Sequence, residues 1–320
     1  MISVALATYN GELYLKKQLI SIIEQSMPVD EIVIVDDCST DNTIEIINDV
    51  KKNTSVDIHL FKNKKNIGYK KNFHKAISLC KGDYIFLCDQ DDLWYKDKVA
   101  LMMNVMLNNP LINVLSTSFE IIDENDNVIN NKLRKNKANN NLIDRTLIKD
   151  SINKMTIEDV FFSNISQGCS MLLTRYFANK FLDFYDFALP HDWFINLLAA
   201  DMNSLYFYNK ILFKYRIHSN NTIGFKDKQT IQDKITLENR LLQAKTILLV
   251  IDTLKHLNIE TVNLNNINEI KEFMEKHIYY VEHKKIIHIL MQNFSPFYSK
   301  IKSKKSRLLD LYYCMVRENK

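Results

Sequence analysis

The sequence predicts an α/β protein with a mostly parallel sheet that is covered by helices on both faces. Over residues 1–90, short and continuously apolar runs alternate with segments of helical periodicity, which is the pattern of repeated strand–helix–strand units. Polar residues follow each of these apolar runs. Open sheets of this kind bind ligands beyond the carboxyl ends of their strands, so the site is expected there.

Four strands are expected in this first part, at Ile2–Ala7, Ile32–Val35, Ile58–Phe61 and Tyr84–Cys88. Helices are expected between them, at about residues 15–23, 41–50 and 69–79. Ser39 or Thr40 is placed to cap the second helix. The chemistry-bearing residues at the ends of the four strands should therefore meet at one edge of the sheet.

The pattern changes after the fourth strand. A helix is expected from Lys96 to Asn109, where Pro110 ends it. A further helix is expected at His191–Ala200, and residues 130–141 should form a loop. Strands are expected at Val114–Phe119, Glu120–Ile129 with a turn at Glu124–Asn127, Cys169–Leu173, Leu205–Tyr208 and Ile211–Tyr215. We expect a catalytic domain over residues 1–225 and a helical C-terminal region over 226–320.

Composition narrows the classes of partner and compartment. The net charge of +4 is too small to indicate nucleic-acid binding. The five cysteines, which show no paired spacing, argue against a disulfide framework and favour a reducing compartment. We find no signal-peptide pattern and no apolar run long enough to span a bilayer. A cytoplasmic protein is expected, peripheral on the inner face of the membrane if it contacts lipid.

Three carboxylates lie within four residues directly after the fourth strand: Asp89, Asp91 and Asp92, with Trp94 close behind. Like charges at this spacing repel one another unless a positive charge sits among them. A divalent cation that bridges a diphosphate would supply it, because hard cations prefer oxygen ligands and substrate phosphates. The alternative is a solvated acidic turn after a strand.

Short segments over about residues 1–225 resemble those of glycosyltransferase family 2, which has the GT-A fold. They are Ala7–Gly11, Val35–Asp41, Asn66–Gly68, Asp89–Trp94, Pro190–Trp193 and Tyr215–His218. The last three, with Asn220–Gly224, resemble the rhamnosyltransferase-like branch of bacterial O-antigen and capsule synthesis. The resemblance implies inverting transfer from a nucleotide-diphosphate sugar, dTDP-rhamnose or a UDP-hexose, to a glycan acceptor that is commonly lipid-linked.

The resemblance also implies roles for individual residues in the donor site. Asp91 is the first choice as metal ligand for Mg²⁺ or Mn²⁺, with Asp89 and Asp92 completing the shell and His218 joining the metal or the diphosphate. Contacts to the nucleotide are expected from Thr8, Tyr9, Asn10, Asp36, Asp37, Asn66, Gly68, Asp89 and Arg216.

An inverting transfer needs a base on the face opposite the leaving group. Asp192 matches the family's base position, and His191 is the second choice or a neighbour that orients the acceptor. The plain alternative for Asp192 is a first-turn carboxylate stabilised by the helix dipole. Acceptor contacts are expected from Gln167, Gly168, Trp94 and Trp193.

Two other classes of protein were weighed. An inactive sugar-nucleotide or glycan-binding module would fit loss of a metal aspartate or of the base, but both are present. A nucleotidyltransferase would show a glycine-rich basic signature after the first strand, which Thr8–Gly11 does not supply.

The C-terminal region carries a basic run from Lys300 to Arg307. Phe294, Phe297 and Tyr298 precede it, and Leu308, Leu309, Leu311 and Tyr312 follow it. This segment is compatible with contact to anionic lipid. A solvated helical face with a buried apolar side and a homodimer interface are the alternatives.

Overall fold

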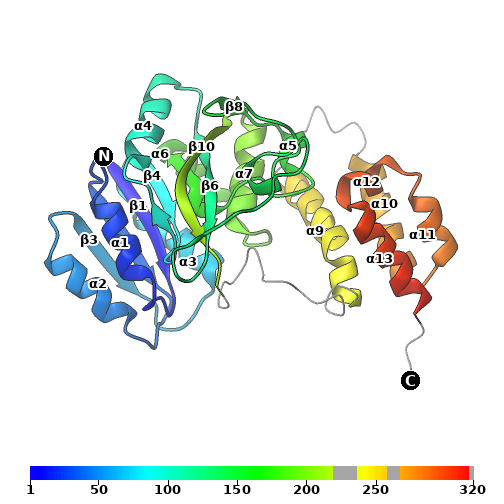
Figure 1. The fold of residues 1–320 in the computed structure, drawn as a ribbon, viewed down its shortest axis with the longest axis horizontal. Coiled ribbons are helices and arrows are strands. Elements are labelled where there is room, and N and C mark those ends of the chain that lie inside the picture. The colour runs from blue at the N-terminus through cyan, green and yellow to red at the C-terminus, as the bar shows by residue number, and fades with distance from the viewer. Residues whose placement is uncertain (219–235, 258–266, 317–320) are drawn as a thin grey trace. The chain divides into compact units, whose positions relative to one another are not determined.

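The computed structural model describes residues 1–218, 236–257 and 267–316 (Figure 1). The chain divides into two compact units, Met1–Asn220 and Asn221–Lys320. The boundary expected at residues 225 and 226 and the segment Asn220–Gly224 lie outside the described residues. Within the described part of the chain, no helix is both long and apolar enough to cross a bilayer.

The first unit is built on one sheet, which has ten strands among the described residues. The strands are β1 (Ile2–Thr8), β2 (Glu31–Asp36), β3 (Asp57–Lys62), β4 (Tyr84–Cys88), β5 (Leu93–Trp94), β6 (Val114–Ile122), β7 (Val128–Ile129), β8 (Ile152–Lys154), β9 (Met171–Thr174) and β10 (Leu205–Arg216). Their order is β3-β2-β1-β4-β9-β6-β10-β5, with β7 beside β6 and β8 beside β10.

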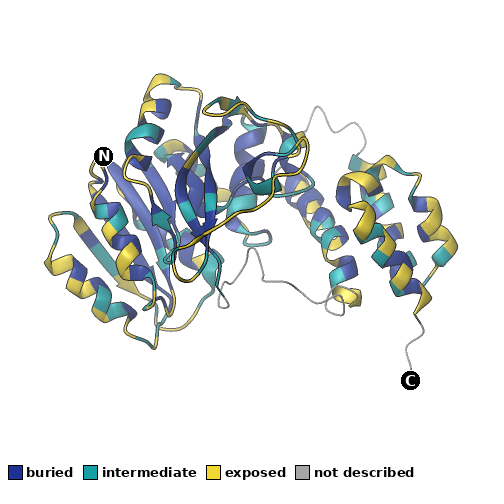
Figure 2. Cartoon of the chain, in the orientation of Figure 1, coloured by how far each residue is buried: buried dark blue, intermediate teal, exposed yellow. Residues whose placement is uncertain are grey.

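The predicted α/β class is confirmed, and the four N-terminal strands pair in parallel. β9 enters the sheet antiparallel to both β4 and β6, so the complete sheet is mixed. The residues of β1, β2 and β4 are almost entirely buried (Figure 2), as continuous apolar runs between two helix layers should be.

Helices connect these strands and cover the sheet. They are α1 (Leu15–Ile23), α2 (Thr43–Lys52), α3 (Tyr69–Leu79), α4 (Lys98–Asn108), α5 (Ile157–Val160), α6 (Arg175–Phe184) and α7 (His191–Asp201). The chain moves one way along the sheet from β1 to β3 and the other way to β4. Right-handed crossovers then place α3 on the face opposite α1 and α2, and α6 and α7 pack with α3.

Several boundaries differ from the sequence-based expectation. β6 runs unbroken through Ile122, and β10 runs unbroken across Asn209 and Lys210, where two strands were expected. Irregular pairing with β6 near Tyr208–Ile211 absorbs this polar pair without ending the strand. The residues expected at the start of the Cys169–Leu173 strand form a 3₁₀ turn, Gly168–Ser170. Helix α6 was not predicted.

The predicted caps of α2 were wrong. Neither Ser39 nor Thr40 caps this helix: the Ser39 hydroxyl bonds to Asp36, and the Thr40 backbone N–H donates to Asn10. Asp41 Oδ1 instead accepts the Thr43 backbone N–H at 3.0 Å. All five cysteines are free thiols, in line with the absence of a disulfide framework in the sequence pattern.

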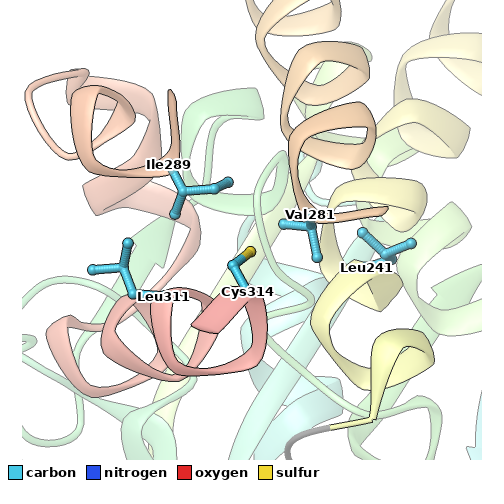
Figure 3. Close-up of a cluster of buried hydrophobic side chains, with 5 residues drawn as sticks. All are labelled: Leu241, Val281, Ile289, Leu311 and Cys314. Carbon is cyan, nitrogen blue, oxygen red and sulfur yellow. The ribbon is translucent and has the colours of Figure 1, made fainter. Parts of the chain in front are cut away.

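The second unit is helical in its described parts. Its helices are α9 (Leu237–His256), α10 (Ile267–Glu282), α11 (Ile286–Gln292), α12 (Pro296–Ile301) and α13 (Lys304–Met315). A small apolar cluster joins four of them through Leu241, Val281, Ile289, Leu311 and Cys314 (Figure 3).

A buried polar network lies in the same unit. Asp310 is fully buried on α13, and its carboxylate accepts from Lys302 Nζ at 2.8 and 3.0 Å and from the Tyr298 hydroxyl at 2.7 Å. Arg240 of α9 reaches the same carboxylate at 3.4 Å, and Lys302 Nζ also lies 3.2 Å from His277 Nε2. One carboxylate therefore compensates two buried cations.

Asp310→Asn should strongly destabilise the second unit, because it leaves Lys302 and Arg240 buried without their counter-charge. We expect a loss of about 3–5 kcal/mol in the free energy of unfolding, measured by urea denaturation. Asp252→Asn, an exposed carboxylate on α9 of the same unit, is the matched control and should change stability by less than about 0.5 kcal/mol. Equal losses in both variants would contradict the role given to the network.

Candidate active site

The order of the strands reverses direction at β1 and β4. These two strands are neighbours, yet the chain leaves β1 toward β2 on its other side. Open α/β sheets bind ligands at such a reversal of strand order. Tyr9 and Asn10 follow β1 at this point, and Asp89 to Asp92 follow β4.

Gln90 connects the loop after β4 with the loop after β1 through hydrogen bonds. Its Oε1 accepts the Tyr9 backbone N–H at 2.9 Å, and its Nε2 donates to the Tyr9 carbonyl at 3.0 Å. A Cβ on Gly11 would lie 2.4 Å from Gln90 Oε1, so a glycine there leaves room for the amide. No role was predicted for Gln90 from the sequence, because nothing in the local pattern distinguishes it.

The carboxylates after β2 organise three loops. Asp36 accepts from the Thr8 hydroxyl and from the Ser39 backbone N–H, both at 3.0 Å. Asp37 accepts the backbone N–H groups of Ile67 and Gly68, each at 2.8 Å. Both aspartates are buried. The described contacts of these carboxylates are thus within the protein, and their contact with a base or ribose stays a prediction.

The other residues expected at the nucleotide lie around these carboxylates. Asn10 Oδ1 accepts the Thr40 backbone N–H at 2.9 Å, and Asn66 Oδ1 accepts that of Gly68 at 3.1 Å. Gly68 has a φ of 83°, a conformation that favours glycine. The Tyr9 side chain is 47% exposed at the rim, where an aromatic ring is free to stack on a planar base.

The three carboxylates after β4 converge, although their partners differ. Asp91 Oδ2 lies 2.9 Å from His218 Nε2. Asp92 is fully buried; its Oδ1 accepts the Arg216 backbone N–H at 3.2 Å, while its Oδ2 has no hydrogen-bond partner among the described residues. Burial, and then the nearby charge of Asp91, raises the pKa of both Asp89 and Asp92.

These residues fit a divalent cation. Carboxylate oxygens of Asp89 and Asp92 and the sulfur of Cys169 all lie within 4.8 Å of one another. The raised pKa values of Asp89 and Asp92 and the unpartnered buried oxygen of Asp92 are compatible with a bound cation at this point. Asp91, the expected first ligand, belongs to the same loop and faces His218.

Arg216 anchors the acidic loop from the end of β10. Its side chain is fully buried; Nε donates to the Asp91 carbonyl at 2.8 Å, and Nη1 pairs with Asp126 at 2.5 Å. The guanidinium also lies 4.5 Å from the centre of the Tyr14 ring. These contacts position the loop, and the expected contact of Arg216 with phosphates stays a prediction.

Lys98 is a buried cation that the sequence analysis missed. Its ammonium donates to the Cys169 carbonyl at 2.8 Å and lies 4.1 Å from the centre of the Trp94 ring. Burial lowers its pKa to about 8, while Cys169, Cys88, Asp92 and Asp89 favour the charged form. The available signal was its spacing to Met102 and Val105, which places a lysine on the buried face of α4.

Asp192 approaches the acidic loop from the first turn of α7. Its charge contributes to the raised pKa of Asp89, so the two carboxylates interact electrostatically. Burial raises the pKa of Asp192 itself to about 6, although its Oδ1 accepts the Trp193 backbone N–H at 2.8 Å. A carboxylate with this pKa is suited to act as a base near neutral pH.

His191 is 5% exposed and stacks on Phe73 with ring centres 4.3 Å apart. Neither ring nitrogen has a hydrogen-bond partner among the described residues. Burial lowers its pKa to about 3, so the ring is neutral and weakly basic near pH 7. This favours Asp192 over His191 as the base.

The residues expected to contact the acceptor differ in how deeply they are buried. Gly168 lies against His191, and Gln167 Oε1 is a buried oxygen without a partner in the described structure. Trp193 is partly buried and donates from Nε1 to the Val160 carbonyl at 2.7 Å. Trp94 is 5% exposed and packs on Phe86, so its described contacts are those of a core residue.

The site resides on a nucleotide-binding type of α/β sheet, and the comparisons with known proteins agree. Residues 3–166, more than half of the chain, match the family model described as Glycosyl transferase family 2. The chain belongs to this family and is a transferase. The predicted family and GT-A fold are thereby confirmed.

Individual relatives are consistent with this assignment. The chain is 32% identical over 232 residues to the "dTDP-rhamnosyl transferase RfbG" of Shigella flexneri, covering 68% of this chain and 73% of the relative. S. aureus TarS 1–349 in complex with UDP superposes with a TM-score of 0.61 at 17% identity, covering 98% and 88% of the two chains. The mannosyltransferase PcManGT from Pyrobaculum calidifontis, in complex with GDP-Man and Mn²⁺, gives 0.53 at 14% identity over 97% and 86%.

Gly168→Ala should disturb the site through His191, because the added Cβ would lie 2.5 Å from His191 Nε2. We expect the free energy of unfolding to fall by about 1–3 kcal/mol. In a His191→Ala background most of this cost should disappear, so a double-mutant cycle measured by urea denaturation should give a clear coupling energy. The same cost in both backgrounds would show that the histidine is not the obstacle.

Proposed function

We propose that the protein is an inverting, metal-dependent glycosyltransferase that uses a nucleoside diphosphate sugar, dTDP-rhamnose or a UDP-hexose. The proposed acceptor is a glycan, carried on a lipid, in the synthesis of a surface polysaccharide. The observation that carries this proposal is the acidic loop of Asp89, Asp91 and Asp92 at the carboxyl edge of the sheet, where the charge of Asp192 also helps to raise the pKa of Asp89.

Relatives support the choice of donor class. One is named a dTDP-rhamnosyl transferase, and the structural neighbours were solved with UDP and with GDP-Man plus Mn²⁺. The rhamnosyl relative aligns over more than two thirds of both chains, which favours a deoxyhexose on dTDP over the other nucleotides.

The residues of the acidic loop would hold Mg²⁺ or Mn²⁺. Asp91 and His218, which lie 2.9 Å apart, would supply an oxygen and an imidazole ligand, the clustered carboxylates of Asp89 and Asp92 would complete the protein's share, and the donor's diphosphate would supply the rest. When bound, the cation stabilises negative charge on the departing nucleoside diphosphate. The exposed Tyr9 ring and the loops held by Asp36 and Asp37 would form the walls around the nucleoside.

Asp192 would act on the acceptor. Its carboxylate takes the proton from the acceptor hydroxyl while that oxygen bonds to the anomeric carbon, and the bond from that carbon to the diphosphate oxygen breaks with its electron pair. Attack from the face opposite the leaving group inverts the anomeric carbon. The neutral His191 ring and the Gly168 backbone would shape the acceptor side next to Asp192.

A location at the cytoplasmic face of the membrane is part of the same proposal. Nucleotide sugars and reduced thiols suit that compartment, and the five free cysteines are compatible with it. A lipid-linked acceptor would then require the protein to work beside the bilayer.

A thermal-shift panel with dTDP, UDP, GDP and CDP, each with and without Mn²⁺, tests the donor site. One nucleotide should raise the melting temperature in a metal-dependent way, because a ligand that binds only the folded state stabilises it by mass action. We expect dTDP to give the largest shift. Asp91→Ala should lose the metal-dependent part, and an unchanged shift in that variant would refute the metal assignment.

The pH dependence of turnover tests the base. Below a pKa of about 6 Asp192 is protonated and cannot accept a proton, so kcat/KM at saturating Mn²⁺ should fall about tenfold per pH unit there and level off above.

Asp192→Asn should lower kcat by roughly 10²-fold or more while nucleotide affinity persists. A variant that kept turnover, or that lost nucleotide binding in the same panel, would argue against the base role.

A further inference from the structure

Two helices of the second unit expose stripes of large apolar side chains. The exposed residues are Ile287, Met291 and Phe294 on and just after α11, and Leu308, Tyr312 and Met315 on α13. Phe294 is 92% exposed. In each helix the three residues are spaced by three or four positions, so they share one helix face. We refer to these six residues as the outer apolar surface.

The two stripes belong to neighbouring antiparallel helices. Lys284, just before α11, donates from Nζ to the Val316 carbonyl at the end of α13 at 3.0 Å. Arg307, in the first turn of α13, donates to Asn293 Oδ1, just after α11, at 3.2 Å. The opposite faces of both helices enter the common core through Ile289 and Leu311 (Figure 3). The stripes therefore lie on faces directed away from that core.

The segment that carries the outer apolar surface is strongly basic. From His283 to Val316 the sequence holds seven lysines and arginines and a single acid, Asp310. Asp310 is buried, and Lys302 is buried with it. The remaining six cations are at least partly exposed: Lys284, Lys285, Lys300, Lys304, Lys305 and Arg307. Lys304 and Lys305 open α13, immediately before the exposed Leu308.

We propose that the outer apolar surface docks on an anionic lipid bilayer. Its apolar side chains would enter the boundary between headgroups and acyl chains, and the surrounding lysines would meet lipid phosphates. A second copy of this chain is a poorer occupant, because pairing the same face of two copies brings like charges together. The inference deepens the proposed membrane location and does not depend on turnover.

The structure also corrects which residues are available for lipid. Tyr298 and Leu311, which the sequence suggested beside the basic run, are buried in the unit, and so is Lys302 within that run. Ile287 and Met291, which precede that run by 13 and 9 residues, are exposed instead. Burial in the folded unit decides which residues of the amphipathic segment face outward.

Vesicle flotation with the full chain tests the proposal. The protein should float with vesicles of phosphatidylcholine containing about 30% phosphatidylglycerol, weakly with pure phosphatidylcholine, and less at high salt. Lys304→Glu/Lys305→Glu should weaken binding about tenfold or more. The matched control is Lys51→Glu/Lys52→Glu, an adjacent exposed lysine pair on α2, which should leave binding unchanged.

A second pair of variants tests the apolar contribution. Phe294→Ser should weaken flotation, whereas Leu111→Ser, at a residue 73% exposed in the first unit, should not. Absent binding to anionic vesicles, or equal loss in variants and controls, overturns the proposal. So does a homodimer in light scattering that Phe294→Ser abolishes, which would assign the surface to a second copy. Because flotation needs no catalysis, failure here is distinct from failure of the transferase assignment.

Discussion

The concentration of three carboxylates at one edge of the sheet is the constraint on which the first unit depends. Asp89, Asp91 and Asp92 lie in one short loop, and their mutual repulsion must be offset by groups from elsewhere. Two residues more than 120 positions later contact this loop: Arg216, at the end of β10, donates to the Asp91 carbonyl, and the His218 ring lies 2.9 Å from Asp91 Oδ2. β10 reaches this point because it pairs with β6 along its length. The acidic loop is therefore complete only when the last strand has joined the sheet.

Local patterns were sufficient to predict the first half of this arrangement. The apolar runs that became β1, β2 and β4 are buried on both faces, so their hydrophobic pattern is continuous and easy to recognise. Parallel strands end at the same edge of a sheet. This rule alone predicts that Tyr9, Asp36 and Asp91 lie at one edge, without any information on contacts. His218 was expected beside the metal or diphosphate; its ring lies next to Asp91, and its contact with either of these groups stays a prediction.

Other parts of the site depend on long-range contacts that leave little trace in sequence. β9 lies between β4 and β6 and is antiparallel to both. This direction depends on pairing with its neighbours, and the short apolar pattern of β9 does not reveal it. Gln90 forms two hydrogen bonds with backbone atoms of Tyr9. Because any residue at position 9 would offer the same backbone atoms, the sequence does not predict this contact. Trp94, which follows the acids, was expected to contact an acceptor sugar. The ammonium of Lys98, four residues later, instead packs on its ring.

The position of Asp310 on α13 sets more than the stability of its unit. Its carboxylate meets donors from α9, from α12 and from the residue that follows α12. Turning α13 about its axis, or sliding it by one turn, would separate all of them at once. A purely apolar contact would tolerate such a slip because neighbouring leucines are interchangeable. The buried acid thus fixes the rotation and register of α13. Because Asp310 must face its buried donors, Leu308, Tyr312 and Met315 are directed toward solvent.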